Sequence, residues 1–122
     1  MKRLSNWLIC LFAICATTQA SAAVLTYGAQ LTGAAEAPPN ASRGTGSALV
    51  TIDTVLASMV VQFNFAGLSG TTTAAHIHCC TAVPGAGTVG VASVTPNFTG
   101  FVLGVSAGSY FETYNLLAPV GT

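Results

Sequence analysis

Charge is scarce in this 122-residue chain, which holds only three basic and three acidic side chains. A protein that binds nucleic acid needs clustered basic residues to neutralise phosphates, and the sequence has no such cluster. A disordered chain is excluded as well, because 52% of the residues are hydrophobic. A chain of this length is predicted to form one domain at most.

The sequence also lacks an apolar run of about 20 residues, the length that a membrane-spanning helix requires. A shorter apolar stretch, LSNWLICLFAICA, follows Lys2 and Arg3 and precedes the small residues of TTQASAA. This order is typical of a secretory signal peptide, so residues 1–22 are predicted to be removed after Ala22. The mature chain, 23–122, is expected to be secreted, periplasmic or at the cell surface, with no membrane span after cleavage.

No segment after the leader has the apolar periodicity of an amphipathic helix. Apolar and polar side chains alternate instead, most clearly in SMVVQFNFAGL, where Val61, Phe63 and Phe65 share a face opposite Gln62 and Asn64. Similar short runs between turn-rich segments are SALVTID, VLTYGAQLTG, GTVGVASV, NFTGFVLG and SYFETYNLL. The pattern predicts an all-β antiparallel sandwich with helix confined to the leader, and with Val61, Phe63 and Phe65 facing the core.

Histidine and cysteine are rare, yet those of the mature chain all lie in one stretch, TAAHIHCCTAVPG. If this stretch is extended, His76, His78 and Cys80 share one face. Histidines two apart on a strand can converge on one ion that lies about 2 Å from each ring nitrogen. The two histidines are predicted to form a half-site for zinc or copper. Cys80 is the nearest third ligand, and Cys79 is either a redox partner or packed inward.

Other interpretations of this stretch stay open. Structural zinc takes four protein ligands and catalytic zinc three, so a carboxylate from Glu36, Asp53 or Glu112 would be an alternative completion. The histidine pair could equally be a polar strand face bonded to neighbouring loops. In an oxidising compartment the cysteines could form a disulfide with each other, pair with another chain or bind metal. A bond between neighbours is disfavoured by their Cα separation of about 3.8 Å, which is short for a disulfide.

Three segments, LTGAAEAPPNASRGTGSALVTID, FNFAGLSGTTTAAHIH and GAGTVGVASV, together resemble the CHRD domain. This module was first described in chordin and also occurs in exported bacterial proteins, and the resemblance runs from about Leu31 to about Leu116. It implies an immunoglobulin-like β-sandwich or barrel with limited similarity to copper/zinc superoxide dismutases. It also implies a metal-binding role in which His76 and His78 are the ligands. Because chordin is an extracellular protein that binds growth factors, an extracellular protein or matrix partner is implied too.

The chain departs from the family pattern in two places. Members often have glycine after the His-x-His motif, whereas this chain has Cys79 and Cys80. The family typically continues through a segment resembling Asn-Ile-His-Thr and a closing Gly-Glu-Ile-Arg-Gly strand, whereas this sequence stops at NLLAPVGT. The domain at 23–122 is therefore expected to be incomplete at its C terminus.

The sequence thus predicts an exported, non-catalytic binding module with a metal half-site. A superoxide-dismutase-like copper/zinc enzyme is one alternative, but such an enzyme needs several more histidines and an arginine that steers the anion. The mature chain has no histidine beyond His78, and Arg43 is its one basic residue. A nucleophile elbow and a phosphate loop are also missing, so no catalytic residue is predicted. A structural or adhesive extracellular module is the other alternative.

Overall fold

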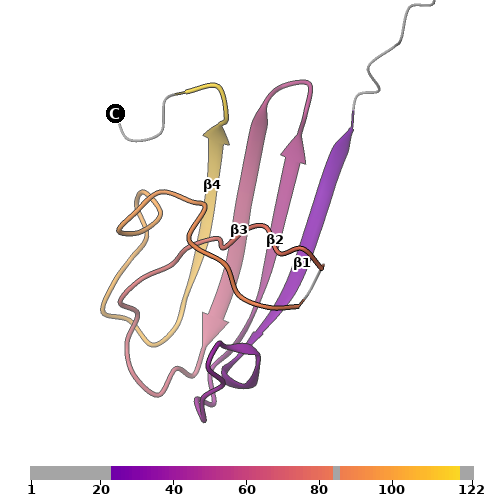
Figure 1. The fold of residues 1–122 in the computed structure, drawn as a ribbon. Helices are drawn as coiled ribbons and strands as arrows, with labels where there is room; N and C mark the ends of the chain where they lie inside the picture. Colours follow the sequence, from indigo (N-terminus) through magenta and orange to yellow (C-terminus); the bar gives the residue numbers. More distant parts are fainter. Residues whose placement is uncertain (1–22, 84–85, 119–122) are drawn as a thin grey trace, which may run out of the picture.

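The computed structural model describes residues 23–83 and 86–118, which form one antiparallel sheet of four strands (Figure 1). The strands are β1 (Val24–Thr32), β2 (Thr45–Asp53), β3 (Ser58–Ala66) and β4 (Gly108–Asn115), and they lie in the order β1-β2-β3-β4. In these two ranges the only helix is a 3-10 turn, η1 (Gly33–Ala35). The prediction of an all-β antiparallel fold is confirmed, whereas the leader helix and its cleavage site lie outside the described residues.

The two faces of the sheet differ as the alternation in β3 predicts. Val61 is 2% exposed and lies opposite Val50 of β2, and Phe63 and Phe65 are half-buried on the same face. Gln62 and Asn64, which point to the other face, are exposed. The face that carries Val61 is called the inner face below. The core residues predicted from the sequence therefore lie on the correct side of the sheet.

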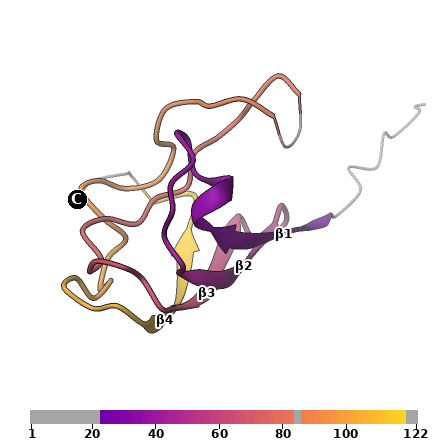
Figure 2. The ribbon, with the colours of Figure 1, turned by 90° about the horizontal axis from the view of Figure 1, so that it is seen from below.

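The second layer of the sandwich is the long connection between β3 and β4. Its described residues, 67–83 and 86–107, run across the inner face and contain no named strand (Figure 2). Strands were predicted in GTVGVASV and NFTGFVLG, and the structure contradicts both predictions. In the second of these segments, Gly100 and Gly104 adopt positive φ angles of 74° and 78°, which lie outside the extended region and therefore interrupt a strand. The connection closes on itself where Thr72 N–H donates to the carbonyl of Val105 at 2.9 Å.

Aromatic side chains join the connection to the sheet. Phe98 is 4% exposed, and its ring stacks on Tyr110 of β4 with the centroids 5.4 Å apart. The ring of Phe101 lies 5.7 Å from that of Phe63 on β3. Within the described residues, Val61 and Phe98 are the buried hydrophobic side chains, so each layer contributes one residue to the centre of a small core.

The hydroxyl of Tyr110 lies between the two layers. It donates to the carbonyl of Thr99 at 2.8 Å and shares a hydrogen bond of 2.7 Å with the hydroxyl of Tyr114. Burial raises the pKa of Tyr110 above its ordinary value, and the hydrogen bond to Tyr114 and the charge of Glu112 act in the same direction. The folded protein therefore keeps this proton at a pH where the unfolded chain, which titrates near 10, has lost it.

Stability is expected to fall as the pH rises through about 10, because the unfolded state then releases a proton that the folded state retains. Thermal unfolding midpoints of the wild type between about pH 8 and pH 11 should decline more steeply than those of Tyr110→Phe. Tyr27→Phe is the matched control, because Tyr27 is 56% exposed, and it should keep the wild-type slope. Identical slopes in all three proteins would show that Tyr110 makes no such contribution.

Candidate functional site

The histidine pair lies in the connection between β3 and β4, at a point where two parts of that connection bind each other. Ile77 N–H donates to Oγ of Ser93 at 2.9 Å, and Ala92 N–H donates to the carbonyl of Ile77 at 2.8 Å. Ala75 N–H donates to Oδ1 of Asn97 at 3.3 Å. These bonds hold the backbone on both sides of His76.

This stretch does not form the extended strand on which a shared face for His76, His78 and Cys80 would depend. Of residues 75–80, only His78 takes part in sheet-type pairing, through an isolated antiparallel bridge to Val91. The physical reason is that Ser93 and Asn97 offer side-chain oxygens to the backbone N–H groups of Ile77 and Ala75. Side-chain acceptors replace the carbonyl groups of a partner strand, so a ladder cannot extend.

Both imidazole rings are held by backbone carbonyls. Nε2 of His76 lies 2.6 Å from the carbonyl oxygen of Pro96, and Nδ1 of His78 lies 2.8 Å from that of Val89. A carbonyl oxygen only accepts, so both of these nitrogens carry hydrogen. In the neutral rings, Nδ1 of His76 and Nε2 of His78 are therefore unprotonated. The structure thus selects a different tautomer for each histidine.

The rings are close enough for one ion to bind both. Their centroids are 6.2 Å apart and their planes are nearly perpendicular, at 84°. Two imidazoles bound to one ion at about 2 Å per nitrogen have centroids roughly 5 Å apart at a tetrahedral angle, and about 6.3 Å apart when the ion and the two nitrogens lie in line. The observed separation lies near the linear limit, so a tetrahedral ion would draw the rings about 1 Å closer together. His76 is half-buried and His78 is exposed, so an ion could reach the pair from solvent.

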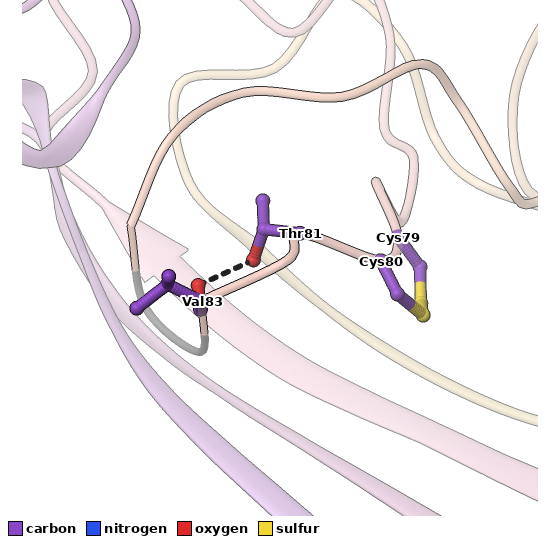
Figure 3. Close-up of a disulfide and its surroundings, with 4 residues drawn as sticks. All are labelled: Cys79, Cys80, Thr81 and Val83. Carbon is purple, nitrogen blue, oxygen red and sulfur yellow. Dashed lines mark hydrogen bonds between the residues drawn. A yellow bond between two sulfur atoms is a disulfide. The ribbon is translucent and has the colours of Figure 1, made fainter.

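The neighbouring cysteines, Cys79 and Cys80, are joined by a disulfide (Figure 3). This bond is one of the three possibilities that the sequence left open. In the oxidised form neither sulfur is a thiolate, so Cys80 would be able to bind metal only after reduction. Both residues are exposed, and the loop continues into Thr81, whose hydroxyl donates to the carbonyl of Val83 at 2.8 Å.

The carboxylates considered as further ligands do not complete the pair. Across residues 23–83 and 86–118, no group of three or more His, Cys, Asp or Glu side chains is placed to hold a metal ion. Oδ1 of Asp53 instead accepts from the N–H groups of Val55 and Leu56, both at 2.8 Å, in the turn between β2 and β3. Glu112 lies on β4. The described residues therefore offer two imidazole ligands and open positions around them.

A cavity of about 480 Å³ separates the connection from the inner face of the sheet, and both histidines line it. Phe63 and Phe98 belong to its apolar wall, and Glu36, from the segment between β1 and β2, also lines it. Sequence reasoning missed this cavity because its walls come from segments far apart in the chain. The alternation in β3 located the apolar side, but no sequence signal located the opposite wall.

The fold and the site define an all-β domain in which a histidine pair lines a cavity between a sheet and a covering connection. The chain belongs to the CHRD domain family, whose model matches residues 27–109. The membership expected from the motifs is thereby confirmed. No curated protein and no solved structure is significantly similar to the chain. Among the described residues, no helix is both long and apolar enough to cross a membrane.

Proposed function

We propose that this protein is an exported, non-catalytic binding module in which His76 and His78 hold a zinc or copper ion. The observation that carries the proposal is the hydrogen bond from each ring to a backbone carbonyl, at Pro96 and Val89. Such bonds fix the tautomer and orientation of metal-binding histidines and leave the second nitrogen free to coordinate. Membership of the CHRD family supports a binding role for the domain.

The chemistry of the ligands favours these two metals. Imidazole nitrogen suits zinc and copper, whereas calcium and magnesium prefer oxygen ligands. Two protein ligands leave further coordination positions, which water or a side chain of a bound extracellular partner would fill. A bound ion would supply a Lewis-acidic point of attachment. The domain would then act as an adhesive or matrix-binding module. His76 and His78 would coordinate the ion from one side, and the partner would coordinate it from the other.

Catalysis is not part of the proposal. A superoxide-dismutase-like centre needs several histidines, and in the described part of the chain no third His, Cys, Asp or Glu joins the pair. Membership of a family also does not by itself establish an activity.

Calorimetric titration with Zn²⁺ and with Cu²⁺ tests the proposal directly. The protein is expressed with its own leader, purified after export and compared with His76→Ala/His78→Ala. The wild type should bind one ion, and its affinity should be lower in acidic buffer, because metal-binding histidines must be deprotonated. Circular dichroism confirms that the double variant folds. Equal affinity in the two proteins would refute the metal site.

Export is a separate part of the proposal, motivated by Lys2, Arg3 and the small residues before Ala23. The mass of the protein recovered from the periplasm or medium should correspond to a chain that begins at Ala23. Recovery of an intact chain, Met1 included, from the cytoplasm would contradict export, and the metal titration would then use the protein purified from the cytoplasm.

A further inference from the structure

In the part of the chain that the structure describes, the outer edge of β1 is an extended backbone without the usual protection. The strand has nine residues, VLTYGAQLT, with no charged side chain and no proline. Eight of these nine residues are exposed, and Leu31 is half-buried. Natural edge strands are normally protected by charge, proline, bulges or a covering segment, because their unpaired N–H and C=O groups otherwise attract another strand. Within residues 23–83 and 86–118, β1 pairs only with β2.

The backbone groups that face the open edge can be assigned from the register. Thr54 N–H donates to the carbonyl of Ala23 at 3.1 Å, so the backbone of Ala23 is directed at β2. Backbone direction alternates along an antiparallel strand, so every second residue after Ala23 also bonds to β2. The intervening residues direct their N–H and C=O groups outward: Val24, Thr26, Gly28, Gln30 and Thr32.

We propose that this edge pairs with β1 of a second copy of the chain, which joins two sheets into one of eight strands. The two-fold axis passes through Gly28, the middle of the five outward-directed residues. In this antiparallel register Thr26 faces Gln30 of the second copy, and Val24 faces Thr32. Each outward-directed residue then meets another outward-directed residue, as hydrogen-bonded pairs require. The inference does not depend on the histidine pair.

The side chains of β1 match a copy of themselves in this register. On the inner face, Leu25 comes to lie opposite Leu31 of the second copy, and Tyr27 opposite Ala29, so apolar side chains meet apolar ones. Leu25 is 42% exposed and Tyr27 is 56% exposed, so the pairing would remove apolar surface from water. Since the strand carries no charge, no like charges oppose each other across the axis. A self-complementary surface of this kind is what a two-fold dimer needs.

The opposite edge of the sheet, at β4, is less suited to such pairing. Glu112 is exposed in the middle of β4, and self-pairing would bring two carboxylates close together. The connection also lies beside this strand, since the hydroxyl of Tyr110 donates to the carbonyl of Thr99 (Figure 1). A contact between two strands is smaller than the interfaces of permanent dimers, so the association at β1 is reversible and depends on concentration.

Sedimentation velocity of the exported protein, from about 5 to 500 µM, tests the proposal, because this range covers the affinities of small interfaces. The wild type should shift from monomer to dimer. Thr26→Lys/Gln30→Lys should raise the dissociation constant about tenfold or more, since each lysine then opposes a lysine of the second copy. Both residues are exposed on the outer face, so the monomer should remain folded. Thr113→Lys, an exposed position on β4, is the matched control and should dimerise as the wild type does.

A charge exchange separates loss of pairing from loss of folding. Thr26→Glu/Gln30→Glu alone should also be monomeric, whereas an equimolar mixture with the lysine variant should recover dimers, because opposite charges then face each other. A wild type that stays monomeric throughout overturns the proposal. It is equally overturned if the lysine variant dimerises like the wild type, or if mixing the two charged variants restores nothing.

Discussion

Replacing Phe98 by alanine is expected to lower the free energy of unfolding by about 3–5 kcal/mol, the usual cost of deleting a buried aromatic ring. Phe98 is 4% exposed and stacks on Tyr110 with the centroids 5.4 Å apart. Its ring also lies 6.1 Å from that of Phe63. The loss is large because this side chain packs the connection onto the sheet, and the described residues of the connection form no strand ladder of their own.

Phe111→Ala provides the matched control, because Phe111 is 66% exposed on the outer face. Its replacement should change stability by no more than about 0.5 kcal/mol. Urea unfolding, followed by circular dichroism, measures both variants.

Total stability is typically about 5–15 kcal/mol, so Phe98→Ala could leave too little folded protein to measure. Phe98→Leu, which keeps most of the volume, should then show a smaller loss that is still resolved from the control. Equal losses at Phe98 and Phe111 would contradict the two-layer core.

The sheet could be predicted from the sequence because one of its faces is covered and the other is not. Alternation in SMVVQFNFAGL identified β3 and the direction of Val61, and the same signal identified β1, β2 and β4. Apolar and polar residues alternate with a period of two because successive side chains of a strand point to opposite faces, and only one face is covered. The information is local, so a single sequence suffices to locate it.

The connection, 67–107, could not be predicted in the same way. GTVGVASV and NFTGFVLG contain the residues of strands, but in the structure their backbone groups bond elsewhere. Phe98 N–H, for example, donates to the carbonyl of Ala75, which lies far away in the sequence. Such bonds depend on the tertiary arrangement, which overrides the local preference of these residues for extended structure.

Only the two histidine ligands of the candidate site could be predicted from the sequence. Two histidines in a chain this poor in histidine mark the place, and their spacing suggests a shared ion. Their carbonyl partners, Pro96 and Val89, come from a segment with no recognisable motif. The tautomers that these carbonyls select, and the cavity that both histidines line, emerge only when the connection folds over the sheet.

His76→Ala alone is expected to weaken Zn²⁺ binding at least about 100-fold, the upper end of what the loss of a supporting hydrogen-bond partner costs. Removing the ligand itself should lower the Zn²⁺ affinity by at least this factor, because the described residues offer no third side chain to take the place of His76. His78→Ala should have a similar effect. The double variant should be little weaker than either single variant, since one remaining imidazole holds zinc poorly. Calorimetry at constant pH measures all three, and a single variant that binds like the wild type would contradict a shared ion.

Experiments on the two cysteines distinguish a metal site with two protein ligands from one with three. In the disulfide form Cys80 has no thiolate, so Cys79→Ser/Cys80→Ser should bind Zn²⁺ as the oxidised wild type does. Reduction of the wild type tests the ligand set predicted from the sequence. If Cys80 is the third ligand, reduction should strengthen zinc binding in the wild type and leave the serine variant unchanged. If reduction strengthens neither, His76 and His78 are the only ligands from this stretch, and the remaining positions around the ion belong to water or to a partner.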